Sequence, residues 1–282
     1  MTTRRKTLLK NNFYSIIKYC FFLLCIIVAL FPILWIIMSS FKTNAEILSN
    51  GIALPTNFKF DGYINALKIS PIPSFFLNSI IITGIATILN VLFLAMAAYV
   101  FARFTFRGKN LIYFILSLSL ILPMTALLHP VYSVVSTLKL ANTRSGLILV
   151  YTALNLPMSL LILRSTFQSI PKGLEEAAYV DGAGFIRIFF QIMMPVAQGG
   201  LTSAGVLSFL FCWNEFTFAL ILTSSQKVRT LPLSLSYFTS QFSFNYTAMF
   251  AAITIAVLPS IIVFAIFQEQ VVSSLVSGAL KE

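Results

Sequence analysis

Long runs of apolar residues without charge are the feature that most constrains this chain. Of its 282 residues, 58% are hydrophobic and only 10% are charged, whereas a soluble domain carries about a quarter charged residues. Runs of about 20 apolar residues can cross a bilayer as helices, in which every backbone polar group is paired internally. The sequence therefore predicts an all-α membrane protein with six transmembrane helices. The predicted spans are residues 19–40, 76–101, 110–131, 145–163, 199–223 and 246–267.

The predicted domain organisation is a single six-span domain, residues 19–267, between an N-terminal segment, residues 1–18, and a C-terminal tail, residues 268–282. An even number of spans places both ends on one side of the membrane. That side carries twelve of the 19 Lys and Arg residues, and loops rich in these residues usually face the cytoplasm. We therefore expect both termini to be cytoplasmic, and the net charge of +11 to reflect membrane orientation and not nucleic-acid binding.

Patterns typical of enzymes and metal sites are missing from the sequence. His129 is the single histidine, and the cysteines lie in apolar runs without disulfide or metal spacing. The chain has no Gly-x-x-x-x-Gly-Lys-Ser/Thr phosphate loop and no evident nucleophile with its base. We expect no catalytic residue, metal or cofactor on this chain.

One polar segment, residues 164–198, interrupts the apolar runs. Pro171 suits the first position of a helix, where its missing N–H costs nothing. Glu175 and Glu176 then fall in the first turn, where the helix dipole favours negative charge. Gly182 and Gly184 permit a bend, and residues 185–194 form a second apolar helix that stops near Pro195. The segment therefore predicts two short helices, and an ordinary surface connection remains the alternative.

Residue spacing in this segment resembles the cytoplasmic coupling loop of ABC importer permeases. That family's pattern is Glu-Ala-Ala, three residues, Gly, nine residues and then Ile-x-Leu-Pro, with Met194 here in place of Leu. Asp-Gly-Ala around the glycine matches the carbohydrate branch. The resemblance implies that the segment contacts an ATPase. The residues that it assigns to coupling are Glu175, Glu176, Ala177, Ala178, Asp181, Gly182, Ala183, Ile192 and Pro195.

A second candidate site lies in the predicted fifth span, at Trp213, Asn214, Glu215 and Phe216. Glu215 is the only carboxylate within a predicted span. A charged side chain in mid-bilayer costs about 3 kcal/mol, so it should face the helix bundle or a water-filled cavity. Two roles remain open, a residue of the translocation path and a structural carboxylate bonded to a neighbouring helix. The segment also resembles the fifth-span signature of sugar-importer permeases. Trp213 and the nearby phenylalanines are candidates to stack on sugar rings, whose C–H faces suit aromatic side chains.

Four amide side chains in apolar surroundings, Asn78, Asn90, Asn155 and Gln241, either line a polar path or join helices. The end of the chain, Ser277-Gly278-Ala279-Leu280-Lys281, resembles the Gly-Ala-x-Lys ending of maltose-type permeases. In that family the tail reaches into the ATPase pair.

Together these resemblances cover nearly the whole chain and identify it as similar to the maltose-type, second permease subunit of a carbohydrate ABC importer. The resemblance implies a multi-pass protein of the bacterial cytoplasmic membrane. It also implies a heterodimer with a homologous permease, two ATPase subunits that carry ATP and Mg²⁺, and an extracytoplasmic sugar-binding protein.

Two alternatives belong to other classes of transporter. The first is a secondary transporter or channel that works without an ATPase; it would need coupling-ion sites or inverted repeats, and neither is evident in the sequence. The second is an ABC permease for a solute other than sugar, which Asp181-Gly182-Ala183 and the Trp213 segment disfavour.

Overall fold

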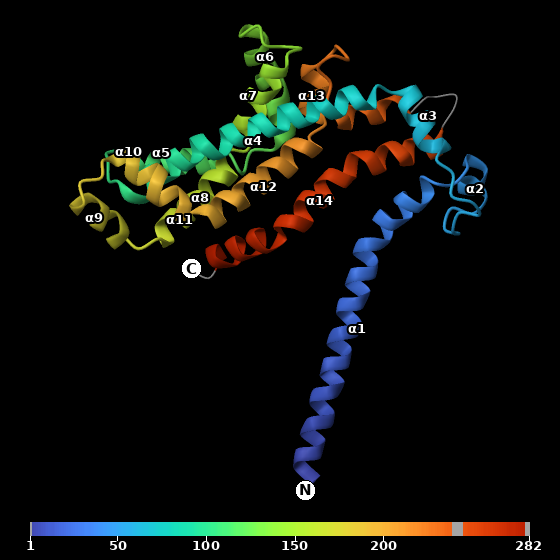
Figure 1. Cartoon of the computed structure of the whole chain (residues 1–282), viewed down its shortest axis with the longest axis horizontal. Helices are drawn as coiled ribbons and strands as arrows, with labels where there is room; N and C mark the ends of the chain where they lie inside the picture. Colours follow the sequence, from blue (N-terminus) through green and yellow to red (C-terminus); the bar gives the residue numbers. More distant parts are fainter. Residues whose placement is uncertain (1, 239–244, 280–282) are drawn as a thin grey trace. The chain divides into compact units, whose positions relative to one another are not determined.

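The computed structural model describes residues 2–238 and 245–279, and the side chains of residues 14–238 and 245–273. The expected signature at Ser277–Lys281 and the amide of Gln241 lie outside the described side chains. Every regular element in the described residues is a helix (Figure 1). The helices are α1 Thr2–Ser39, α2 Asn44–Ser49, α3 Asp61–Ile69, α4 Ile72–Arg103, α5 Lys109–Leu118, η1 Met124–Leu127, α6 Leu128–Thr137, α7 Arg144–Leu154, α8 Leu156–Ser169, α9 Gly173–Val180, α10 Phe185–Ile188, η2 Phe189–Met193, α11 Met194–Val196, α12 Gln198–Asn214, α13 Thr217–Leu222, η3 Leu231–Tyr237 and α14 Tyr246–Ala279.

The chain divides into two compact units, Met1–Ser70 with Phe238–Ile255 and Pro71–Tyr237 with Ala256–Glu282. In the first unit, α1 ends in a polar cluster. Trp35 Nε1 and Lys42 Nζ both donate to the carbonyl of Gly51 at 2.7 Å. The connection after α1 holds two short helices, α2 and α3. A capping box of Thr43 and Glu46 begins α2.

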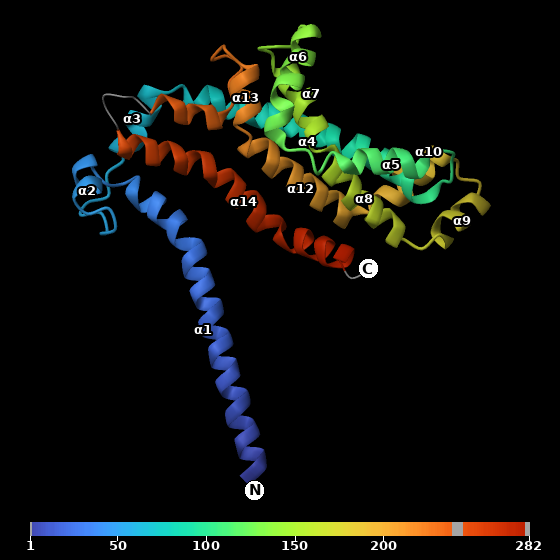
Figure 2. The ribbon, with the colours of Figure 1, turned by 180° about the vertical axis from the view of Figure 1, so that it is seen from behind.

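The second unit is organised around α4, which packs against α7, α8 and α12. Figures 1 and 2 show α4, α8 and α12 side by side. One buried cluster joins the C-terminal half of α4 to α8, η2 and α12, and a second joins its N-terminal half to α7 and α13. Helix α4 is thus the common support for both candidate sites.

Buried asparagines join segments of this unit that lie far apart in the sequence. Asn78 Nδ2 donates to the carbonyls of Lys227 and Arg229 at 3.1 and 2.9 Å. Asn90 Nδ2 donates to the carbonyl of Thr152 at 2.9 Å, and Asn155 Nδ2 donates to Cys212 Sγ at 3.3 Å. Asn90 and Asn155 thus join helices, the structural one of the two roles left open, and Asn78 joins α4 to the loop before η3.

Among the described residues, three helices are long and apolar enough to cross a membrane: Tyr14–Ser39, Ile72–Arg103 and Tyr246–Ser273. The number rises to five if each of two bent pairs forms one span. Pro32 and Pro259 lie inside the first and third of these helices, as membrane helices tolerate. The chain is therefore a multi-pass membrane protein, and the number six remains a prediction.

The predicted third span, residues 110–131, is not a continuous helix. Helix α5 ends at Leu118, and α6 begins at Leu128 after the short 3₁₀ turn η1. Pro123 is the physical reason, because a proline disfavours helical backbone at the residue before it and cannot continue the hydrogen-bond ladder. The predicted fifth span is also interrupted, since α12 ends at Asn214 and α13 begins at Thr217.

Candidate functional site

The polar segment forms a helix, a turn and a second helix, in the order expected from its sequence. Helix α9 begins at Gly173, so the prediction that Pro171 is the first helical residue is wrong. Ile170, before the proline, has an extended backbone, as residues in that position prefer. The N–H of Glu175 then bonds to the carbonyl of Lys172 at 2.9 Å. The proline therefore precedes the helix and opens a turn into it.

A left-handed glycine ends α9. Gly182 has φ +79°, and the N–H groups of Gly182 and Ala183 donate to the carbonyls of Tyr179 and Ala178 at 3.0 and 2.9 Å. This pair of bonds is a Schellman motif, which satisfies carbonyls at the end of a helix. Gly184 keeps an ordinary φ of −73°. Only Gly182 therefore needs the conformational freedom of glycine.

The second helix of the segment is formed by α10, the π-helical turn η2 and α11 in succession. Its buried face carries Ile188, Phe189 and Met193. It ends at Val196, one residue beyond Pro195, close to the predicted end. A bend of 77° then separates it from α12. The segment therefore leaves the line of α12 abruptly.

Side chains of the predicted coupling residues point two ways. Glu175 and Ala178 are buried, with Glu175 9% exposed. The half-buried members are Ala183 and Ile192, and the exposed members are Glu176, Ala177, Asp181, Gly182 and Pro195. Two apolar neighbours that the sequence pattern did not single out, Val180 and Ile186, are 88% and 71% exposed. The outward surface of α9 and its turn is thus small, partly acidic and edged by apolar side chains.

Glu175 is held by the end of α4. Arg103 Nε forms an ion pair with Glu175 Oε1, and Tyr99 Oη donates to Glu175 Oε2 at 3.2 Å. Arg103 Nη2 also donates to the carbonyl of Ile170 at 2.7 Å. One guanidinium therefore bonds to residues on both sides of the connection between α8 and α9. Neither Arg103 nor Tyr99 was identified from the sequence, because their partners lie about 70 residues away.

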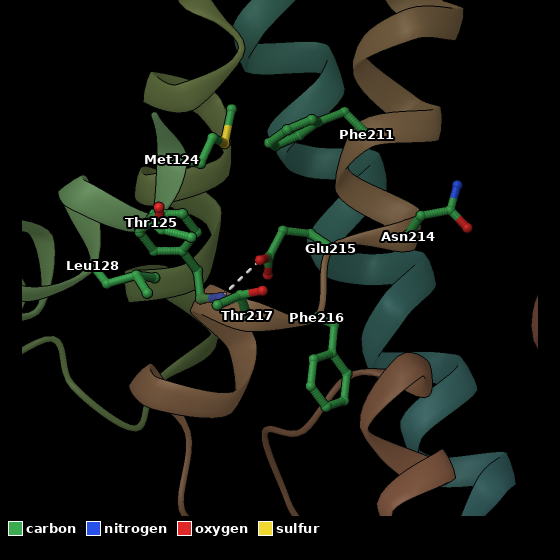
Figure 3. Close-up of a pocket in the computed structure, with 9 residues that line it drawn as sticks. Met124, Thr125, Leu128, Phe211, Asn214, Glu215, Phe216 and Thr217 are labelled. Carbon is green, nitrogen blue, oxygen red and sulfur yellow. Dashed lines mark hydrogen bonds between the residues drawn. The ribbon is translucent and has the colours of Figure 1, made fainter. Parts of the chain in front are cut away.

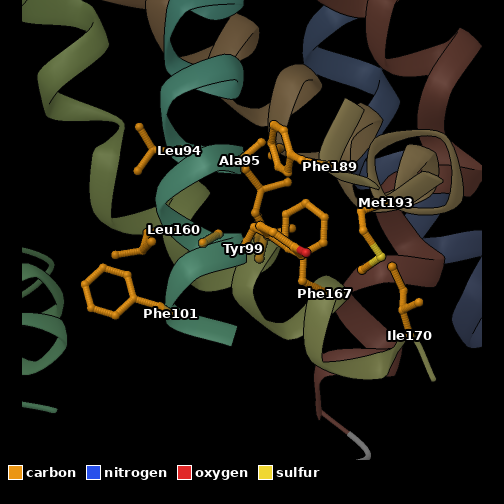
Figure 4. Close-up of a cluster of buried hydrophobic side chains, with 14 of the residues drawn as sticks. Leu94, Ala95, Tyr99, Phe101, Leu160, Phe167, Ile170, Phe189 and Met193 are labelled. Atoms are coloured by element: carbon orange, nitrogen blue, oxygen red, sulfur yellow. The ribbon is translucent and has the colours of Figure 1, made fainter. Parts of the chain in front are cut away.

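Aromatic rings surround the same point. The ring of Tyr99 lies 5.5 Å from that of Phe167, 5.8 Å from that of Phe185 and 5.2 Å from that of Phe189, between ring centroids. Figure 4 shows Tyr99 beside Phe167 and Phe189 within the buried cluster. These partners lie on α8, α10 and η2. Tyr99 therefore contacts both helical parts of the segment.

Glu215 lies at the break between α12 and α13. Its carboxylate accepts hydrogen bonds from the backbone N–H groups of Phe218 and Ala219 at 2.7 and 3.0 Å and from Tyr151 Oη at 2.8 Å. The dashed line in Figure 3 is the bond to Phe218. The carboxylate thus faces the helix bundle, as expected, and it caps α13.

A cavity of about 330 Å³ lies beside this break. Its lining includes Asn214, Glu215 and Phe216 of the predicted path. Figure 3 shows the rest of the lining, whose residues are Met124, Thr125, Leu128, Phe211, Thr217 and Phe218. The hydroxyls of Thr125 and Thr217 and the carboxylate of Glu215 therefore lie among aromatic rings, a combination that suits a polar solute with C–H faces. The contribution of η1 and α6 was missed, because a continuous helix was expected there.

Trp213 lies away from this cavity. Its side chain is 2% exposed, donates from Nε1 to the carbonyl of Ala256 at 2.9 Å, and is stacked on Phe209 with centroids 5.6 Å apart. The Trp213 ring therefore packs within the protein, and the expected stacking of Trp213 on a sugar has no support in this arrangement, whereas Phe211, Phe216 and Phe218 do line the cavity.

Comparison with known proteins identifies the family. The family described as binding-protein-dependent transport system inner membrane component matches residues 92–276. The diacetylchitobiose uptake system permease protein NgcG of Streptomyces coelicolor is 37% identical over 95% of this chain and 89% of its own length. The trehalose/maltose transport system permease protein MalG of Thermococcus litoralis is 34% identical over 92% of this chain and 94% of its own length.

A solved structure shares the fold. A chain from a bacterial ABC transporter involved in the import of the acidic polysaccharide alginate superposes with a TM-score of 0.80 at 22% identity, over 92% of this chain and 97% of that chain. The fold is therefore that of an ABC permease. With the family match and the relatives above, the chain belongs to the binding-protein-dependent transport system inner membrane components.

Proposed function

We propose that this chain is a permease subunit of a bacterial ABC importer for carbohydrate. The observation that carries the proposal is the full-length similarity to permeases named for diacetylchitobiose and for trehalose and maltose. The cavity at the α12–α13 break adds chemical support, because its polar groups lie among the rings of Phe211, Phe216 and Phe218. In this account Asn214, Glu215 and Phe216 border the translocation path, and Trp213 supports them from within the protein.

The proposed assembly contains a second, homologous permease, two ATPase subunits and an extracytoplasmic sugar-binding protein. ATP and Mg²⁺ belong to the ATPases, and this chain itself is neither an enzyme nor a cofactor protein. Six spans would cross the bacterial cytoplasmic membrane, with residues 1–18, 164–198 and 268–282 in the cytoplasm. The distribution of Lys and Arg along the sequence supports this orientation.

The ATPase docks, in this proposal, on the outward surface of α9 and its turn. Glu176 and Asp181 offer negative charge to a basic partner. Ala177 lets another surface approach closely, and Val180 and Ile186 present apolar area that is otherwise exposed to water. ATP-driven movement of the partner would then displace α9 and shift a two-state bundle between inward and outward openings.

The experiment on carbohydrate import uses the complex purified from native membranes through a tag on this chain. The complex is reconstituted in liposomes with its binding protein, and uptake of labelled diacetylchitobiose, trehalose and maltose is measured with and without ATP. Labelled amino acids serve as the control solutes. We expect ATP-dependent accumulation of carbohydrate alone. Accumulation without ATP, or of amino acids instead, would contradict the proposal.

A cross-linking experiment tests the docking surface. In a chain whose native cysteines are replaced, Ala177→Cys places a thiol on the exposed side of α9, and Ala178→Cys places one on the buried side. We expect the first variant, and not the second, to cross-link to the ATPase. Equal yields from both variants would show that this side of α9 is not the contact.

A further inference from the structure

The connection into α9 is a short turn whose first residue, Ile170, is buried and whose last residue, Lys172, is exposed. Between the end of α8 at Ser169 and the start of α9 at Gly173, the backbone bonds are short-range turns. A Cβ added at Gly173 would meet no atom within 4 Å, so nothing packs against the chain there. If α9 were displaced, the turn alone would bend and leave the membrane helices in place, unless side-chain contacts held α9 to them.

Those contacts come from one end of α4. Arg103 bonds both to Glu175 on α9 and to the carbonyl of Ile170 before the connection. Tyr99, one turn earlier on α4, bonds to the other oxygen of the same carboxylate. The side chains of Arg103 and Glu175 are only 6% and 12% exposed. They are therefore not available to a docked protein, and both oxygens of Glu175 are committed to α4.

The second helix of the segment, α10 with η2, also packs against Tyr99. The ring of Tyr99 contacts Phe185 on α10 and Phe189 on η2, and Phe104, just after α4, contacts Phe185 with centroids 5.6 Å apart. The aromatic contacts hold α10 and η2, and the ion pair holds α9. Both helices of the segment, α9 and α10 with η2, thus contact the last turn of α4.

We propose that Arg103, Glu175 and Tyr99 are positioning residues that join α9 to α4 as one rigid body. They transmit a displacement of α9 to the membrane-spanning helix, where a free connection would absorb it. The inference rests on the proposed docking of an ATPase on α9. It assigns Glu175 a role different from that of its neighbour Glu176: Glu176 meets the partner, and Glu175 carries the movement inward.

The test compares single variants in the whole transport complex reconstituted in liposomes. Arg103→Met and Glu175→Gln each remove the ion pair, and Tyr99→Phe removes only the hydroxyl while keeping the ring. Arg107→Met is the matched control, since it deletes an exposed arginine four residues further along. For each variant, the ATPase recovered per chain and the solute accumulated per ATP hydrolysed are measured.

We expect the ATPase to be recovered in wild-type proportion with every variant. Solute moved per ATP should fall by about two- to thirtyfold in Arg103→Met and Glu175→Gln, the range of coupling effects produced by residues between two sites. It should fall less in Tyr99→Phe and stay unchanged in Arg107→Met. A merely stabilising ion pair would lower the yield of complex and leave the ratio of solute to ATP unchanged, which would overturn the inference.

A rescue experiment distinguishes stiffness from charge. Arg103→Cys with Glu175→Cys, in a chain without native cysteines, replaces the ion pair by two thiols that a short bifunctional reagent can join. We expect the ratio of solute to ATP to be low before linking and to rise toward the wild-type ratio after it. A ratio that linking leaves unchanged would contradict the rigid-body role. If instead the wild-type complex contained no ATPase, the proposed docking would fail, an outcome separate from these.

Discussion

Glu215 ends one helix and caps the next with a single carboxylate. It accepts two backbone N–H bonds from α13 and one hydroxyl bond from Tyr151. Three of about four acceptor positions on an ionised carboxylate are thereby used. A solute in the neighbouring cavity would therefore contact a Glu215 carboxylate that already accepts three hydrogen bonds from the protein. Of the two roles left open by the sequence, the structural one is directly visible, and a role in the path would be additional.

Glu215→Ala should therefore lower stability more than Glu215→Gln. Alanine leaves the N–H groups of Phe218 and Ala219 and the hydroxyl of Tyr151 without their acceptor, which costs about 1–3 kcal/mol for a buried group. Glutamine keeps one acceptor oxygen. Thermal unfolding of the purified complex measures the difference. Equal melting temperatures for the two variants and the wild type would show that the cap contributes nothing.

Gly182 offers a second prediction about a single residue. A Cβ there would meet no atom within 4 Å, so Gly182→Ala is penalised only by its φ of +79°, at about 1–2 kcal/mol. Gly184→Ala is the matched control, because its φ is ordinary and its surroundings are equally open. Amide hydrogen exchange of α9 should quicken in the first variant alone. Similar exchange in both would mean that the turn does not depend on glycine.

Among the elements, α2 provides a prediction about pH. The pKa of Glu46 is lowered to about 2 from an ordinary value of 4.5, chiefly by the hydrogen bond from the backbone N–H of Thr43 and next by that from the hydroxyl of Thr56. Because the pKa is lower in the folded state, ionised Glu46 favours the folded α2 above about pH 4.5. That contribution is lost as the pH falls from 4.5 toward 2.

Thr56→Val should accordingly raise the pKa of Glu46, since it removes a donor to the carboxylate. Ser49→Ala is the control, because the Ser49 hydroxyl donates to the main-chain carbonyl of Glu46 at 3.4 Å and not to its carboxylate. Carbon-13 NMR of the labelled Glu46 carboxyl, followed through an acid titration, reports the pKa directly. An unchanged value in Thr56→Val would rule out the hydroxyl as a cause.

The elements that the sequence predicted well are those with local signals. The two glutamates in the first turn of α9, the glycine that ends it and the proline near the end of the next helix all act within a few residues. The breaks at residues 119–123 and at Glu215 were missed for different reasons. Pro123 gave a signal that the length of the apolar run outweighed, whereas Glu215-Phe216 contains neither glycine nor proline. One of the three hydrogen bonds that hold the Glu215 carboxylate comes from Tyr151, 64 residues away.

Long-range pairing also explains what was missed at the coupling segment. The spacing of Glu-Ala-Ala and Gly marks the segment, but no local pattern distinguishes Glu175, which is buried against Arg103, from Glu176, which is exposed. Only the packing of α9 against α4 separates the two. The sequence therefore located the segment. The structure was needed to show that Glu176 is exposed and that Glu175 is bonded to α4.

For the whole molecule, the distribution of apolar side chains agrees with a membrane setting. In Tyr14–Ser39, none of the most hydrophobic stretch is buried against the rest of the chain. Such a surface would be a liability in water, and in a bilayer it faces lipid or another helix.

The central claim is that the exposed side of α9 connects this chain to ATP hydrolysis, and Glu176→Lys tests it most directly. The measurement is ATP-dependent carbohydrate uptake by liposomes that contain equal amounts of membrane-inserted chain. Asp61→Lys provides the same charge reversal at an exposed residue of α3. We predict that Glu176→Lys abolishes uptake while the chain still inserts, and that Asp61→Lys retains most of it. Wild-type uptake by Glu176→Lys would contradict the account.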